Sequence, residues 1–235
     1  MSTFPGGTSV SFLDVYTDIG PDGLRGGSPH VHLASTECYL VIGGAGRLQT
    51  LSMNGYEEIE LTAGTITWFT PGVIHRAVND DDLRVIVLMS NAGLPEAGDA
   101  VMTFPPEDLA DPTRYREIAA LPDRPSEIER AADAARRRDR AVTGFLTLRT
   151  AALAGEVHVL EQFYADAARL VTPRVDGWDR IVAEGPQAQL NRTQVALSAL
   201  RSQDLTHLAL AQVQTASLDA AEPRFGMCGR LRPLS

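Results

Sequence analysis

The sequence predicts an antiparallel, mainly β domain followed by an α-helical C-terminal region. Up to about residue 90, short stretches of β-forming residues recur at roughly ten-residue spacing between turn residues, as in sandwiches and barrels. Beyond residue 125, apolar residues recur at helical spacing instead. We therefore expect a barrel at residues 1–92, a proline-rich connecting strap at 93–125, and a mainly helical region at 126–235. This last region would pack on the barrel or at a dimer interface.

The turns between the expected strands are marked by glycine, proline, asparagine and aspartate. Asn54-Gly55 is the strongest hairpin signal in the chain. Ala63-Gly64 and Pro71-Gly72 favour two further turns, and the glycine-rich run 43–46 and the run 79–82 favour two more. The expected strands are residues 8–16, 30–32, 37–42, 47–52, 57–61, 65–70, 74–78 and 83–89.

The second half begins with helix-start signals. Asp111-Pro112 is a typical N-cap and first-turn pair for a helix to about residue 120. Ser126 with Glu129 forms a capping-box pattern ahead of a long amphipathic helix. Further helices are expected at residues 159–171, 178–183 and 187–201. Residues 205–216 could be helix or strand, the tail from 224 is expected to be irregular, and the arginine-rich run 136–140 is expected on a solvated face paired with nearby acids.

Composition limits the functional classes. The 235 residues carry a formal net charge of −9, which argues against nucleic-acid binding. No apolar run approaches membrane-spanning length, and residues 1–7 do not resemble a signal peptide. The two cysteines, Cys38 and Cys228, are too few for a disulfide framework and favour free thiols. We therefore expect a cytoplasmic protein with no membrane or nucleic-acid partner.

Three histidines and one glutamate predict a metal site. His30 and His32 are two residues apart, so on a strand both imidazoles point to one face. Glu37 follows after a gap long enough for a tight turn, and His75 follows the Pro71-Gly72 turn. Three imidazoles and a carboxylate that converge inside a β structure are typical ligands of a first-row transition metal.

These residues also carry a resemblance to a known family. The stretch from His30 to Gly44 resembles the first conserved motif of the cupin superfamily: an H-x-H pair, four residues, Glu37, six residues and a glycine. Residues 64–79 resemble the second motif, in which Gly72 precedes His75 by three positions. The resemblance covers roughly residues 8–90 and implies a double-stranded β-helix, or jelly-roll, barrel. It also implies that the four residues bind one divalent metal and that the protein is a homodimer.

The predicted site permits several functions. Imidazole and carboxylate ligands are compatible with Fe, Mn, Ni or Zn, and the resulting positive site would favour a small polar substrate. We favour a dioxygenase, because isomerisation needs a base beside the metal. No carboxylate other than Glu37 stands out as a candidate for this base, and the chain contains no lysine. The alternatives are a sugar isomerase or epimerase, a non-catalytic protein that binds a sugar-like molecule, and a structural protein with a vestigial site.

Few other residues are candidates for the site. Tyr39 lies two positions after Glu37 and shares its inward face, so it could contact a metal ligand or the substrate, or simply line the barrel. Cys38 should face away from the metal. His158 and His207 lie outside the motifs and are expected to be surface or packing residues.

Overall fold

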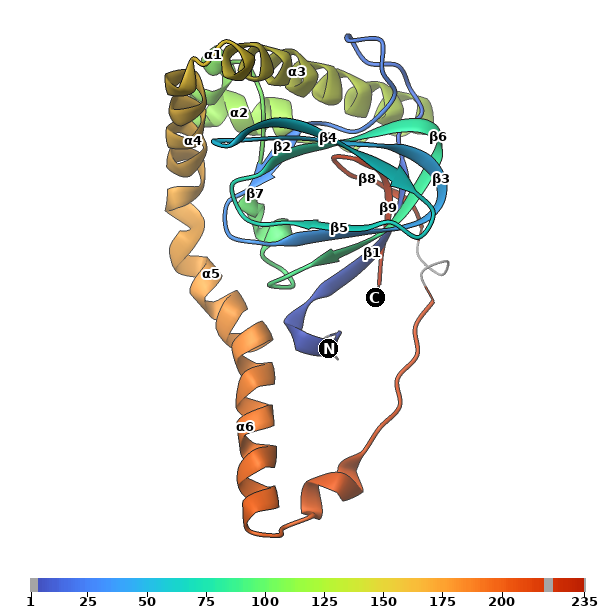
Figure 1. Cartoon of the computed structure of the whole chain (residues 1–235), viewed down its shortest axis with the longest axis vertical. Coiled ribbons are helices and arrows are strands. Elements are labelled where there is room, and N and C mark those ends of the chain that lie inside the picture. Colours follow the sequence, from blue (N-terminus) through green and yellow to red (C-terminus); the bar gives the residue numbers. More distant parts are fainter. Residues whose placement is uncertain (1–3, 218–221, 235) are drawn as a thin grey trace.

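A computed structural model describes residues 4–217 and 222–234 and confirms a mainly β barrel followed by helices (Figure 1). All strand pairs are antiparallel, and the main path of the sheet runs β4-β3-β6-β1-β9-β8. Strand β2 pairs with β6, and β5 pairs with β3. The barrel strands from the first 92 residues are β1 (Ser9–Val15), β2 (His30–His32), β3 (Glu37–Ser52), β4 (Gly55–Thr62), β5 (Ile66–Phe69) and β6 (Ile74–Met89).

Strands β3 and β6 are longer than the sequence predicts, because each continues through a turn signal. The glycine run 43–46 and the run 79–82 form a bulged stretch of the β3–β6 ladder, with register shifts between residues 41 and 46. Gly44 adopts a φ of 71°, and a Cβ there would lie 2.1 Å from the Asp82 carbonyl oxygen. The bulge lets each long strand bend and contribute to two parts of the barrel.

The helical half begins where its capping signals predict. The Asp111 side chain accepts a hydrogen bond from the Thr113 amide, and Ser126 and Glu129 form a complete capping box. Among the described residues, no helix has the length and apolar character needed to cross a bilayer. The helices are α1 (Pro106–Leu109), α2 (Pro112–Ala119), α3 (Glu127–Leu153), α4 (Val157–Val171), α5 (Val175–Val182) and α6 (Ala188–Arg201), with short turns η1 (Pro5–Gly7), η2 (Pro95–Asp99), η3 (Thr172–Arg174), η4 (Ala183–Gln187) and η5 (Thr206–Leu210).

The buried apolar residues form two hydrophobic clusters, one of which joins the barrel to the helices. One lies inside the barrel and includes Tyr39, Leu48 and Val85. The other joins barrel residues such as Ile74 to Phe145 of α3 and further residues of α4, so these helices cover one side of the barrel. Burial of this much apolar surface is the main force that holds the helical half in place.

Two segments outside residues 1–92 are unexpectedly strands of the sheet. In the strap, β7 (Ala100–Met102) pairs with β2. At the C-terminus, β8 (Arg224–Phe225) and β9 (Gly229–Pro233) form a hairpin, and β9 pairs with β1. The prediction of an irregular tail was therefore wrong, because β9 is stabilised by pairing with β1, and β8 by pairing with β9, rather than by a local pattern. In the segment 205–216, residues 206–210 form the helical turn η5.

The arginine run on α3 is only partly solvated. Arg137 is buried and donates hydrogen bonds to the carbonyl oxygens of Ala119 and Gly226. Arg138 is also buried and donates to the carbonyl oxygens of Asp18 and Ile19. The prediction of a solvated face is therefore correct for the neighbouring arginines of the run but not for Arg137 and Arg138. These two buried side chains connect α3 to barrel loops and to the C-terminal hairpin.

Candidate metal site

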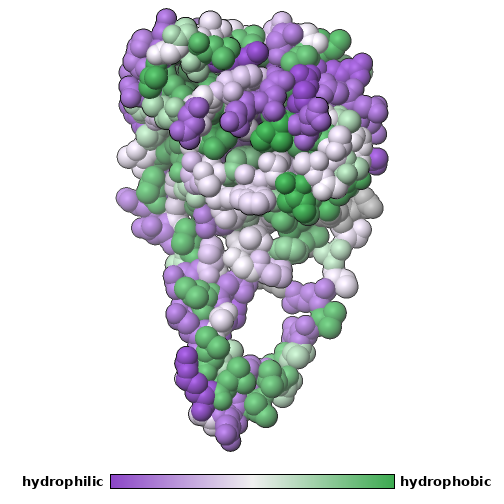
Figure 2. Space-filling model, viewed as in Figure 1, coloured by the Kyte–Doolittle hydropathy of each residue, from purple (hydrophilic) through white to green (hydrophobic). Residues whose placement is uncertain are grey.

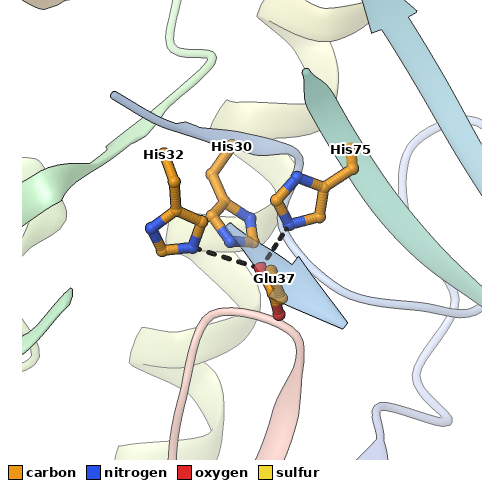
Figure 3. A group of neighbouring side chains, drawn as sticks. All are labelled: His30, His32, Glu37 and His75. Carbon is orange, nitrogen blue, oxygen red and sulfur yellow. Dashed lines mark ion pairs between the residues drawn. The ribbon is translucent and has the colours of Figure 1, made fainter. Parts of the chain in front are cut away.

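Three strands bring the predicted ligands together inside the barrel. In the β2–β6 ladder His30 lies directly opposite His75, and His32 follows on the same face of β2. Glu37 is the first residue of β3 and points back toward the three rings (Figure 3). One potential ligand atom from each of the four side chains lies within 4.8 Å of the others, and all four residues are buried. The local spacing of two short motifs is thus sufficient to build the cluster.

Each imidazole is oriented by its Nδ1 atom. His30 Nδ1 lies 2.9 Å from the Ser28 carbonyl oxygen, and His75 Nδ1 lies 3.1 Å from the Val73 carbonyl oxygen. His32 Nδ1 lies 3.2 Å from a carboxylate oxygen of Asp99. Because these partners can only accept, each Nδ1 carries the hydrogen. In a neutral ring of this tautomer the Nε2 atom carries a lone pair, and this is the form of histidine that binds metals.

The four ligand atoms are arranged as they would be around a bound cation. Glu37 Oε2 lies 3.0 Å from His75 Nε2, yet neither buried atom has a hydrogen-bond partner. With the ring hydrogen on Nδ1, both atoms are acceptors, and two buried acceptors this close repel each other. A divalent ion among the four ligand atoms would satisfy them, so the donor set fits a first-row transition metal.

The charges of the four ligand residues indicate the same preference. Burial and the neighbouring His75 and His32 lower the pKa of His30 well below its ordinary value. Burial also opposes a charge on His32, but its hydrogen bond to Asp99 and the nearby Glu37 carboxylate outweigh burial and raise the pKa of His32 to about 9. Burial opposes ionisation of Glu37, yet the nearby His75 and His32 hold its pKa well below the usual range. The site therefore retains a carboxylate and attracts a positive charge, for which a proton serves when no metal is bound.

Asp99 is the residue that sequence reasoning missed. It lies at the end of η2 in the strap, is fully buried, and accepts from the backbone amides of residues 33, 34 and 35 as well as facing His32. Burial disfavours its charge, but the hydrogen bonds from His32 and these amides lower its pKa. No spacing rule links it to the motifs, since it follows Glu37 by more than sixty residues.

Aromatic and sulfur side chains lie beside the cluster. The ring of Phe69 lies 4.2 Å from that of His75, and the ring of Tyr39 lies 6.4 Å from it. Tyr39 is fully buried, and its hydroxyl lies 3.7 Å from Cys228 Sγ at the tip of the C-terminal hairpin. In Figure 3 this hairpin passes close to Glu37. Tyr39 thus lies near the ligands, as predicted from its spacing, while a direct role for it in the site remains a prediction.

The other histidines and Cys38 lie outside the cluster of metal ligands, as the sequence predicts. His158 lies on α4 at a groove between helices, and neither His158 nor His207 belongs to the cluster. Cys38 points outward from β3, away from the ligands, and both cysteines are free thiols. Burial raises the pKa of Cys228 to about 12, so this thiol is held in its neutral form.

The barrel and its cluster define a double-stranded β-helix domain with four potential metal ligands. Residues 15–91 match the family model described as "Cupin domain", and this part of the chain is a cupin domain. No curated protein matches the chain.

Three solved structures illustrate the resemblance. A conserved protein with a double-stranded β-helix domain from Klebsiella pneumoniae is 24% identical over 35% of this chain and 64% of that one, with a TM-score of 0.27. Streptomyces PAC13 with uridine is 14% identical over 38% of this chain and 63% of that one, with a TM-score of 0.29. A recombinant oxalate oxidase in complex with glycolate is 17% identical over 37% of this chain and 51% of that one, with a TM-score of 0.26. Each match spans less than two thirds of the other protein.

Proposed function

We propose that this protein is a metal-dependent enzyme acting on a small polar organic molecule, with dioxygenase chemistry favoured. One observation carries the proposal: three imidazoles, each oriented through its Nδ1 atom, lie with Glu37 in a buried cluster whose ligand atoms are within 4.8 Å of one another. A single divalent ion, Fe, Mn, Ni or Zn, would be held by His30, His32, Glu37 and His75. When bound, the ion would supply Lewis acidity and, in the case of iron, the ability to activate dioxygen.

The protein atoms around the ion would select its substrate. One carboxylate against a divalent cation leaves the site positive by about one charge, which favours an anionic or chelating molecule. Four protein ligands would leave coordination positions on the ion open to such a molecule. Phe69 and Tyr39 provide apolar and aromatic surface next to His75 and help to exclude bulk water.

The absence of a free base at the cluster favours the dioxygenase over the sugar isomerase or epimerase. Isomerisation of a hydroxy-carbonyl compound requires a group that removes and returns a proton. Asp99 places a further carboxylate beside the cluster, but its oxygens are engaged by three backbone amides and His32. The chain contains no lysine to replace it.

A second candidate is a non-catalytic protein that holds a small ligand on the metal. The burial of the cluster favours it, because Glu37 is only 5% exposed and His75 is fully buried. The C-terminal hairpin lies against the same region through the Tyr39–Cys228 contact. An enclosed site of this kind would retain a sugar-like ligand without converting it.

Elemental analysis of the purified protein tests the site first. We expect about one transition-metal ion per chain, lost in His75→Ala and retained in the matched control His158→Ala, because His158 lies outside the cluster. Undiminished metal in His75→Ala would refute the site.

Activity assays then separate the candidate functions. With iron-loaded protein and a panel of small hydroxy and keto acids and sugars, a dioxygenase consumes oxygen and forms product. Turnover under strict anaerobiosis would refute the dioxygenase in favour of the isomerase or epimerase. Tight binding with the ligand recovered unchanged would support the non-catalytic protein.

A further inference from the structure

The segment that leads into β2, residues 18–28, covers a charged side chain of the barrel. Figure 2 shows hydrophilic residues over much of the molecular surface, where charged side chains normally lie. Arg76 of β6 is an exception, because it is fully buried. It follows His75 directly, so the two side chains point to opposite faces of the strand. A buried charge is costly unless it is paired, so the partners of Arg76 show what this side chain holds.

All of the contacts of the Arg76 guanidinium are made to residues 18–28. Its Nη1 and Nη2 atoms donate to the two carboxylate oxygens of Asp22, and Nε lies 3.1 Å from the carbonyl oxygen of Gly27. Asp22 is itself held, because its Oδ1 atom also accepts from the Leu24 amide. A guanidinium that contacts both oxygens of one carboxylate has a fixed orientation. Asp22 therefore aims the Nε–H of Arg76 at a single carbonyl group, that of Gly27.

The carbonyl group that Arg76 holds belongs to the peptide just before Ser28. The N–H of the same peptide donates to the Met227 carbonyl oxygen at 2.8 Å, so this planar unit is held at both ends. Ser28 precedes Pro29, and a residue before proline is restricted to extended conformations. The direction of the Ser28 carbonyl group is then fixed as well. Its oxygen lies 2.9 Å from Nδ1 of His30 and orients this imidazole.

The other two imidazoles do not depend on this series of contacts. His75 is oriented through a carbonyl oxygen of its own turn, although it is next to Arg76 in the sequence. His32 is oriented by the strap. A change at Arg76 should therefore act on one ring of the three, that of His30.

We propose that Arg76 is a positioning residue for His30. By holding the peptide between Gly27 and Ser28, it keeps the Ser28 carbonyl oxygen against Nδ1, so that the Nε2 lone pair of His30 is available to a cation. The inference rests on the proposed metal site and adds a residue on the opposite face of the sheet on which the ligand geometry depends. Without the Nε–H donor the peptide can turn, and His30 loses the fixed tautomer that metal binding needs.

Two double variants of the full-length protein separate positioning from support of the fold. In Arg76→Gln with Asp22→Asn, the glutamine amide nitrogen takes the place of the arginine Nε atom and can donate as it does. In Arg76→Met with Asp22→Asn, a methyl group that cannot donate takes this place. Both variants leave no unpaired charge at the two positions, so they differ chiefly in the donor to the Gly27 carbonyl oxygen. Circular dichroism verifies that each variant folds.

Nitrogen-15 NMR of the metal-free protein gives the first result. We expect His30 to carry its hydrogen on Nδ1 in the native protein and in the glutamine variant, and to populate both tautomers in the methionine variant. The spectra of His32 and His75 should not change.

The affinity for Zn²⁺, measured by competition with a chelator, gives the second result. It should fall by roughly 10-fold in the methionine variant and be retained in the glutamine variant. The matched control is Arg47→Met with Asp80→Asn, because Arg47 also donates through Nε to an aspartate but lies at the barrel surface. The control should retain both the histidine spectra and the affinity.

Equal tautomer populations, or equal Zn²⁺ affinities, in the methionine and glutamine variants would overturn the proposal and leave Arg76 as a support of residues 18–28 only. If the methionine variant does not fold, the glutamine variant decides: a retained hydrogen on His30 Nδ1 supports the proposal, and its loss overturns it. Rapid exchange of the native Arg76 Nε–H with solvent would overturn it without any variant. A native protein that binds no metal would refute the proposed function, while the His30 tautomers would still decide the role of Arg76.

Discussion

The barrel and the C-terminal half contribute to the candidate metal site in different ways. The barrel supplies all four potential ligands, from β2, β3 and β6. The barrel also orients His30 and His75 through the Ser28 and Val73 carbonyl oxygens, whereas Asp99 of the strap faces His32. Cys228 of the tail lies against Tyr39, next to the ligands. Arg137 of α3 in turn holds the hairpin through the Gly226 carbonyl oxygen. All four ligands thus come from the barrel, while one of the three groups that orient the imidazoles, Asp99, comes from a distant segment.

This difference means that changes outside the barrel should alter the site without removing a ligand. Groups that orient a ligand typically change metal affinity by 10–100-fold. Groups that hold a hairpin in place change mainly the free energy of unfolding. Four experiments can separate the two contributions.

The largest effect is expected from pH. Metal binding needs the Nε2 lone pair of His32, whose pKa is raised to about 9 by Asp99 and Glu37 against the effect of burial. Below pH 9 the ion must therefore displace a proton from His32. Metal affinity should rise about tenfold per pH unit, or about 100-fold from pH 6 to pH 8, and level off above 9. Calorimetric titration in buffers of different ionisation enthalpy should show proton release; a pH-independent affinity would contradict the displacement.

Asp99→Asn tests the strap. An amide cannot replace the carboxylate charge and also accept from the amides of residues 33–35 through both positions, so His32 loses its orientation. We expect metal affinity to fall by roughly 10–100-fold, with a weaker pH dependence, because the pKa of His32 falls too. The control Asp108→Asn alters another fully buried carboxylate, which pairs with Arg114 and Arg140 and lies outside the cluster. Equal metal affinity in Asp99→Asn and the native protein would show that the barrel alone determines the site.

The same difference explains what could be predicted from the sequence. His30 and His32 share a face because strand periodicity is two, and His75 meets them because its strand pairs with theirs. Asp99 has no such local signal, since its neighbours form a short helical turn whose position depends on packing. The β8–β9 hairpin was missed for the same reason, because β9 is stabilised by pairing with the distant strand β1. The long continuous β3 was missed because a glycine run signals a turn and a bulge equally well.

Arg137→Met tests the link between α3 and the hairpin. Methionine keeps much of the apolar stem but removes the hydrogen bonds to the carbonyl oxygens of Ala119 and Gly226. Leaving these acceptors unpaired should lower the free energy of unfolding by about 2 kcal/mol. The control Arg136→Met alters an exposed arginine that pairs with Asp133 and should cost less than about 0.5 kcal/mol. Chemical denaturation measures both, and faster thiol labelling of Cys228 should accompany the first.

The smallest effect is expected from Tyr39→Phe, which removes one hydroxyl between the barrel and the tail. The Tyr39 hydroxyl lies 3.7 Å from Cys228 Sγ, and sulfur is a weak hydrogen-bond partner. Loss of this contact should lower the free energy of unfolding by less than about 1 kcal/mol and leave metal stoichiometry unchanged. Denaturation and elemental analysis measure the two quantities. If the metal is lost, Tyr39 supports the ligands directly; if metal and stability persist while turnover of a substrate falls, the hydroxyl contacts the substrate. Tyr39 belongs to the barrel and Cys228 to the tail. A change in metal content would therefore show that the contact matters for the ligands in the barrel, and a change in stability alone would show that it only holds the tail.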